Sequence, residues 1–193
     1  YGLARVAAKT NDYQKAQEYC DRAVKLFPTE PQVYINRAHV FMMLGQYKVA
    51  AQDLILAMSV GEDESKAVSA IINMSDEHYD DVMNALQNSI DNAPSVGTFY
   101  YLRYSIAMRH LHYGQALRDI KKIISKNFYD DASIYQDAAK CQFEMGLFDM
   151  ALVNIDKALS KDASDIASLV LKARIVEHQG AGKNFDAALG VLT

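Results

Sequence analysis

Five histidines are the side chains of this sequence best suited to bind a metal ion or to transfer a proton. They are His39, His78, His110, His112 and His178. No two of them stand four residues apart with a glutamate after the first, so the spacing of a helical zinc protease site is absent. His110 and His112 are two residues apart, which places them on different faces of a helix. We therefore expect no metal site and no histidine-based catalysis.

The two cysteines, Cys20 and Cys141, lie far apart in the sequence. Both fall within segments whose apolar pattern predicts a helix. Unpaired cysteine is among the most frequently buried residue types and behaves as a small hydrophobic side chain. The pattern therefore favours two core positions over a disulfide or a metal site.

Two other patterns resemble chemical motifs, but structure explains them better. Residues 180–183 read Gly-Ala-Gly-Lys, yet the full phosphate-loop pattern GxxxxGK[ST] is not met and no strand precedes them. We interpret residues 180–184 as an extended turn between helices. The neighbouring carboxylates Asp80–Asp81 and Asp130–Asp131 open predicted helices, where negative charge interacts favourably with the helix dipole. The sequence thus predicts no cofactor and no enzymatic activity.

Composition excludes two classes of binding site. The 193 residues include 20 basic and 24 acidic side chains and carry a net charge of −4, which is no electrostatic footprint for nucleic acid. No run of 18 apolar residues occurs, so no membrane-spanning helix is predicted. Half of the residues are hydrophobic, which is enough for a continuous core.

An aromatic residue that begins a helical segment recurs along the whole chain. These aromatics are Tyr13, Tyr47, Tyr79, Tyr113, Phe148 and Phe185, at intervals of 34, 32, 34, 35 and 37 residues. Within one period, residues 34–57 read as a helix, a stop at Gly45, and a second helix that begins at Tyr47 and carries Ala50 and Ala57. A fixed period of this length is the sequence signature of a helical repeat array.

The unit resembles the tetratricopeptide repeat, whose 34-residue pattern has a small residue in the first helix, a glycine, an aromatic residue and two alanines. The resemblance implies an all-α fold, a right-handed α-solenoid of antiparallel helix pairs. We predict one domain over residues 1–193 with about six repeats, the first and last incomplete. The predicted repeats are 1–30, 31–62, 63–96, 97–131, 132–165 and 166–193. Neither end looks like a polar cap, so we expect a piece of a longer chain. We favour the cytoplasm, although a signal peptide could precede Tyr1.

Three repeats depart from this pattern. Repeat 63–96 has no glycine at the end of its first helix and lacks both alanines. In repeat 97–131, the small residue Ser105 precedes Tyr113 by eight positions where other repeats show nine, and we predict a one-residue deletion in the turn. Repeat 166–193 has extra residues in its predicted turn.

The resemblance also implies a binding groove, lined by fixed positions of each first helix. Carried over residue by residue, it predicts partner-binding residues at Arg5, Ile35, His39, Met42, Met43, Ile71, Met74, Leu102, Ile106, Arg109, Lys140, Phe143 and Arg174, with Ala67, Phe99, Gln136, Val170 and Glu177 beside them. The middle of this set is apolar and rich in methionine, which is common at adaptable binding surfaces. An alternative interpretation is that these apolar residues are buried in the core.

One subfamily can be tested directly, because its members hold a terminal carboxylate with five Lys, Asn and Arg residues in three repeats. Only Asn36 matches that set, so we do not predict this clamp. The sequence favours a non-catalytic scaffold that binds a peptide or helix of a partner protein. The alternative is a structural or oligomerisation module that associates through its incomplete terminal repeats. The sequence does not identify the partner.

Overall fold

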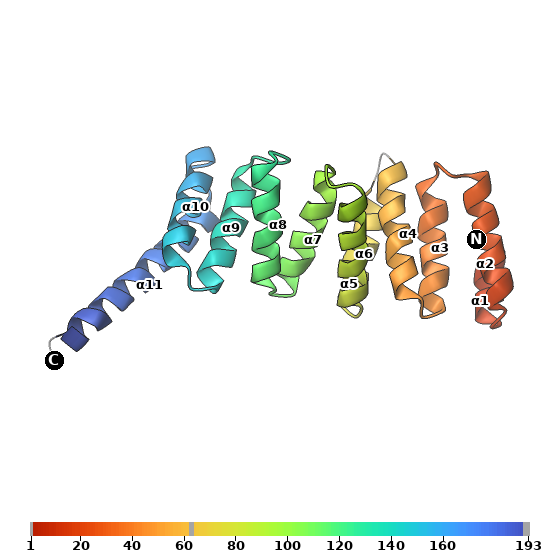
Figure 1. Cartoon of the computed structure of the whole chain (residues 1–193), viewed down its shortest axis with the longest axis horizontal. Coiled ribbons are helices and arrows are strands. Elements are labelled where there is room, and N and C mark those ends of the chain that lie inside the picture. Colours follow the sequence, from red (N-terminus) through yellow and green to blue (C-terminus); the bar gives the residue numbers. More distant parts are fainter. Residues whose placement is uncertain (1, 62–63, 191–193) are drawn as a thin grey trace. The chain divides into compact units, whose positions relative to one another are not determined.

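The computed structural model describes residues 2–61 and 64–190, with side chains to residue 180, and every regular element in these residues is an α-helix. The helices are α1 Gly2–Lys9, α2 Tyr13–Leu26, α3 Pro31–Met43, α4 Tyr47–Val60, α5 Ser65–Ser75, α6 Tyr79–Asn92, α7 Gly97–Arg109, α8 Tyr113–Ser125, α9 Ala132–Glu144, α10 Phe148–Lys161 and α11 Ile166–Gly190. Figure 1 shows α3 and α4, and likewise α9 and α10, as antiparallel neighbours joined by a short turn. The predicted all-α fold of helix pairs is confirmed.

The chain forms two compact units, Tyr1–Phe99 and Tyr100–Thr193. The first unit holds α1 to α6 and the second holds α8 to α11. Helix α7 begins in the first unit and runs from Tyr100 onward in the second.

Four of the turns inside helix pairs have the same chemistry. A residue two positions after the helix end takes the left-handed conformation: Asn11 (φ 61°), Gly45 (φ 69°), Leu111 (φ 59°) and Gly146 (φ 73°). The amide of the next residue donates to the carbonyl five residues earlier, at 2.8–2.9 Å. This bond satisfies carbonyls that the end of the first helix leaves unpaired. The second helix then begins at the aromatic residue, two positions after the left-handed one.

The deletion predicted in the turn of repeat 97–131 is wrong. Helix α7 ends at Arg109 and α8 begins at Tyr113, which is the spacing from Met43 to Tyr47. Leu111 occupies the left-handed position without the help of glycine. The deletion was predicted because Ser105 was taken as the small residue of this repeat. The position nine residues before Tyr113 is occupied by Tyr104.

The fully buried Tyr104 takes the place of a small residue because its hydroxyl finds a partner inside the second unit. That hydroxyl donates to Oδ2 of Asp137 on α9, at 3.2 Å. A buried tyrosine usually needs such a partner. The second unit thus accommodates a large residue where the first unit has Ala38.

The end of α5 confirms that repeat 63–96 has a different turn. The connection of three residues, 76–78, has the usual length, but it contains no left-handed residue. Instead, the amide of His78 donates to the carbonyl of Met74, four residues earlier, at 2.9 Å. The helical bonding pattern therefore persists further than in the other four turns.

The turn predicted at 180–184 is also wrong, because α11 continues from Ile166 to Gly190. Glycine disfavours a helix by only about 1 kcal/mol relative to alanine. Residues 181–190 also include Ala181, Ala187 and Ala188, and alanine is the best helix former. Local propensity therefore favours continuation over a bend.

Alanines lie where the two helices of a pair cross. In the first unit, Ala38, Ala50 and Ala57 are completely buried. In the second unit, the core holds Ala139, Ala151 and Ala158 together with Phe143, Ile155, Leu171 and Ile175. Small side chains let the helix backbones approach, and the larger ones fill the space between neighbouring pairs.

A buried ion pair joins the two helices of one pair in each unit. In the first unit, Nε and Nη2 of Arg37 on α3 both contact the carboxylate of Asp53 on α4, at 2.7 Å. In the second unit, Nε and Nη2 of Arg103 contact Asp119 on α8 at 2.8 and 2.6 Å. Both pairs are 16 residues apart. Their bidentate geometry fixes the rotation of one helix against the next.

Candidate partner-binding surfaces

The structure buries six of the thirteen residues predicted to bind a partner. These are Ile35, Ile71, Met74, Leu102, Ile106 and Phe143. Met42 is half-buried, and the remaining residues are exposed: Arg5, His39, Met43, Arg109, Lys140 and Arg174. The core interpretation therefore describes the six buried residues, whose side chains offer little surface to a partner.

The deletion that was wrongly predicted in the turn before α8 explains why the buried residues Leu102 and Ile106 were named as partner-binding residues. Moving the count by one residue rotates the assigned face of a helix by about 100°. Counted without the deletion, the same positions of α7 are Tyr101, Ser105 and Met108. Tyr101 is exposed and the other two are half-buried. The ring of Tyr101 meets those of Tyr104 and Tyr129 edge-on, at centroid distances of 5.0 and 5.4 Å.

In the first unit, a hollow of about 500 Å³ lies between the first helices α3 and α5. Its lining is His39, Met42, Ser65, Lys66, Ser69, Ala70 and Asn73. A second hollow of about 430 Å³ shares Met42 and Asn73 and adds Met43, Tyr47, Met74, Glu77 and His78. We call these two hollows together the α3–α5 surface. Met42, Met43 and Met74 form its apolar part, and polar side chains such as Lys66 and Asn73 surround them.

Four of the predicted residues, His39, Met42, Met43 and Met74, line the α3–α5 surface. The other residues that α5 contributes were missed, since the prediction named Ala67 and Ile71, which are buried. The lining residues lie one position earlier, at the exposed Lys66 and the half-buried Ala70.

Aromatic stacking closes one end of the α3–α5 surface. The His78 ring stacks on the Tyr47 ring, with centroids 3.3 Å apart and planes 16° from parallel. Both side chains are half-buried. The stack holds the first residue of α4 against the turn that precedes α6.

In the second unit, a hollow of about 380 Å³ lies between the first helices α9 and α11. Its lining is Gln136, Asp137, Lys140, Ala167, Val170, Leu171 and Arg174, which we call the α9–α11 surface. Ala167, Val170 and Leu171 provide an apolar floor. The cations Lys140 and Arg174 rise from opposite walls and are exposed. Here the predicted positions Gln136, Lys140, Val170 and Arg174 all come together.

Aromatic rings hold Arg174 in place. Its guanidinium carbon lies over the Phe143 ring, 4.6 Å from the centroid, within the range of a cation–π contact. The Phe143 ring meets His178 edge-on at 5.2 Å, and His178 stacks on Phe148 at 5.6 Å. Phe143 therefore acts from beneath the surface as a platform that orients Arg174.

Asp137 is the acidic residue in the lining of the α9–α11 surface, and it is half-buried. Burial raises the pKa of the Asp137 carboxyl, against the lowering effect of the hydrogen bond from Tyr104. The exposed charged residues of this lining are Lys140 and Arg174.

Neither cysteine is suited to chemistry. Cys20 and Cys141 are buried and unpaired, as the sequence favoured. Burial raises the pKa of the Cys20 thiol to about 11 and that of Cys141 to about 12. Both thiols stay protonated at neutral pH, and the thiolate is the reactive form.

The described part of the chain shows neither a metal-binding cluster nor a membrane-spanning helix. Across residues 2–61 and 64–180, no three His, Cys, Asp or Glu side chains gather where they could hold a metal ion. Among the helices with described residues, none combines the length and apolarity needed to cross a membrane. Arg5 and Arg109 are exposed but lie outside the two surfaces defined above.

Comparison with known proteins identifies the repeat. The sequence model of a family described as Tetratricopeptide repeat matches residues 1–30, which comprise α1, the Asn11 turn and α2. Residues 1–30 therefore match the tetratricopeptide repeat. The resemblance predicted from the sequence is confirmed.

Several solved structures share this fold. Yeast Tom70 aligns with a TM-score of 0.53 and 18% identity over 92% of this chain and 38% of its own. The C-terminal part of a tetratricopeptide repeat protein from Cytophaga hutchinsonii aligns at 0.52 and 16%, covering 93% and 71%. YrrB, described as a tetratricopeptide repeat protein with an unusual peptide-binding site, aligns at 0.50 and 16%, covering 88% of each chain. At this identity the similarity shows the fold alone.

Proposed function

We propose that this chain is a non-catalytic scaffold that binds segments of a partner protein on the surfaces between successive first helices. The α9–α11 surface carries the proposal. It combines an apolar floor with two exposed cations, one of which is already oriented by an aromatic platform. A preordered side chain loses less conformational entropy when a ligand binds.

The chemistry of this surface favours a partner segment that pairs an acidic residue with an apolar one. The carboxylate would lie between Lys140 and Arg174, and the apolar side chain would cover Val170 and Leu171. Arginine can hold a carboxylate through two parallel hydrogen bonds. The peptide-binding site named for YrrB supports the proposal by analogy of fold.

A peptide array tests this function. Whole protein is applied to octapeptides in which one acidic and one large apolar residue are varied in spacing. We expect the strongest signals from peptides that contain both residues. The double variant Lys140→Glu and Arg174→Glu should weaken them at least tenfold, because a charge-assisted contact is worth about 1.5–3 kcal/mol.

A matched control separates this surface from charge in general. Lys121 and Lys122 on α8 are also exposed cations of the second unit, and Lys121→Glu with Lys122→Glu makes the same change in net charge. The control should keep the wild-type pattern. If the array shows no selective binding, or if both double variants lose it equally, the proposed function is wrong.

A further inference from the structure

Helix α8 and the residue that follows it expose a face with four cations and no acidic side chain. These cations are Arg118, Lys121, Lys122 and Lys126, and all four are exposed. They follow one another at intervals of three, one and four residues, which places them on one side of the helix. The opposite side is buried at Ala116, Ile120 and Ile123. We call the four cations the α8 basic face.

The charge of the α8 basic face is not balanced within the described chain. Across residues 2–61 and 64–180, none of its four side chains forms an ion pair. Arg118 donates to the neutral Gln115 at 2.6 Å. By contrast, Lys172 in the same unit pairs with Asp156 at 2.8 Å. Like charges three or four residues apart on a helix repel each other, so this face destabilises the folded chain.

The repeat does not require cations at these positions. Counted from the aromatic residue that begins each second helix, the same positions on α6 are the exposed amides Asn84, Gln87, Asn88 and Asn92. The helix dipole favours cations in the last turn of α8, which explains Lys122 and Lys126. It does not explain Arg118 and Lys121, which lie before that turn. Their charge is what an anionic partner would neutralise.

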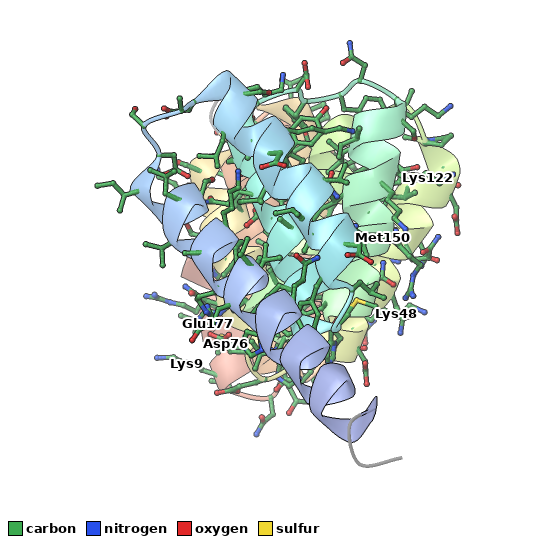
Figure 2. The ribbon with its side chains drawn as sticks, turned by 90° about the vertical axis from the view of Figure 1, so that its left-hand side faces the viewer. Lys9, Lys48, Asp76, Lys122, Met150 and Glu177 are labelled. Carbon is green, nitrogen blue, oxygen red and sulfur yellow. The ribbon has the colours of Figure 1, made fainter. Side chains whose placement is uncertain are left out.

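Exposed apolar side chains lie on the same side of the second unit. Figure 2 shows Lys122 on α8 and Met150 on α10 on this side. Met150 is 54% exposed, and Val153, about one turn further along α10, is 57% exposed. Val153 takes the position on α10 that Arg118 takes on α8, five residues after the aromatic. This side of the unit therefore combines cations with apolar side chains.

We propose that the α8 basic face binds the surface of a lipid bilayer with anionic headgroups, and that Met150 and Val153 enter the interface beside it. The four cations extend over about 12 Å along α8, so they contact several headgroups at once. Each cation near such a surface strengthens binding about fivefold. The apolar pair favours a bilayer over an acidic polypeptide, because the bilayer interface accepts both kinds of side chain. The proposal does not depend on the function of the α9–α11 surface.

Co-sedimentation of the whole chain with lipid vesicles tests this proposal. The vesicles contain about two-thirds phosphatidylcholine and about one-third phosphatidylserine. We expect binding that is much weaker with pure phosphatidylcholine, and that falls at least tenfold between about 0.1 M and about 0.5 M salt. The double variant Lys121→Glu with Lys122→Glu should weaken it at least twentyfold, because two attractions of about fivefold each are lost.

Two further variants separate this binding from other effects. Lys140→Glu with Arg174→Glu makes the same change in net charge on the α9–α11 surface, and it should bind the vesicles as wild type does. It should lose the peptide array instead, so failures of the two proposals can be told apart. Val153→Ser should weaken vesicle binding roughly threefold without changing its salt dependence. All the substituted side chains are exposed, so circular dichroism should show unchanged helicity.

Four results would overturn the proposal. Three of them are a wild-type chain that does not bind the mixed vesicles, equal binding to pure phosphatidylcholine, and an equal loss in the two double variants. The fourth is a wild-type chain that ignores the vesicles but binds a polyglutamate peptide through Lys121 and Lys122. That result would assign an acidic polypeptide to the α8 basic face.

Discussion

Arg37 and Arg103 are the residues whose role the sequence concealed. Both look like ordinary surface cations in the helical pattern, yet the side chain of Arg37 is 18% exposed and that of Arg103 is 9% exposed. Each lies 16 residues before its aspartate. That repeated spacing was the available signal for a buried ion pair. The spacing alone was not enough to predict it, because most charged side chains on helices are solvated, and whether one is buried depends on how the next helix packs.

We expect Arg103→Ala to lower the free energy of unfolding by about 3–5 kcal/mol, because it leaves the buried Asp119 carboxylate without its counter-ion. Urea denaturation followed by circular dichroism measures the loss. Lys172→Ala is the matched control, since its pair with Asp156 is 42% and 52% exposed. It should lose no more than about 1 kcal/mol. Equal losses in the two variants would show that the buried pair has no special role.

Asp137 should make stability depend on pH. Burial raises the pKa of its carboxyl, so the folded chain holds this proton more tightly than the unfolded chain does. A raised folded pKa means that the contribution of Asp137 is fully favourable below its ordinary pKa, near 3.9. That contribution falls as the pH rises through the raised folded pKa, and it stays low above it.

The variant Asp137→Asn lacks this titration while its amide oxygen can still accept from Tyr104. The free energy of unfolding of the variant minus that of wild type should therefore increase when the pH is raised from about 3.5 to about 6. Urea denaturation at both pH values gives this difference. Asp80→Asn is the control, because the Asp80 side chain is exposed. A difference that is constant or decreases with pH would contradict the burial of this carboxyl.

At the scale of elements, the turns decide which residues face solvent. Sequence reading placed the ends of most helices well, because Asn11, Gly45 and Gly146 are residue types that adopt the left-handed conformation. It failed at Leu111, where a β-carbon makes that conformation unfavourable and the residue type gives no warning. The continuation of α11 through 180–184 was missed for the opposite reason. Glycines that signal a turn elsewhere are tolerated within a helix here.

Leu111 should be a site where glycine stabilises the chain. Its φ is 59° and its side chain is 66% exposed, so Leu111→Gly relieves backbone strain without removing core contacts. We expect a gain of about 1 kcal/mol in the free energy of unfolding, reduced by the greater freedom of glycine in the unfolded chain. The reverse change, Gly45→Leu, should destabilise by a similar amount. A loss of stability in Leu111→Gly would mean that the turn is not strained.

At the scale of the whole molecule, the repeat period was enough to predict the all-α fold, because it comes from residues that the helix pairs require. The binding surface was less predictable. A count of repeat positions names a face of a helix, and an error of one residue turns that face toward the core. This explains why Lys140 and Arg174 lie on a surface while Ile106 is buried. Lys140 and Arg174 each lie six residues before the glycine of their repeat, Gly146 and Gly180, and both are exposed, although Phe143 on α9 is buried.

An exchange of charge between protein and peptide is the most direct test of binding on the α9–α11 surface. The best acidic peptide from the array is paired with a twin in which lysine replaces its acidic residue, and both are titrated by fluorescence polarisation. Wild type should prefer the acidic peptide at least tenfold, and Lys140→Glu with Arg174→Glu should prefer the lysine twin. If both proteins keep the same preference, the peptide does not bind between Lys140 and Arg174, and the proposed function is contradicted.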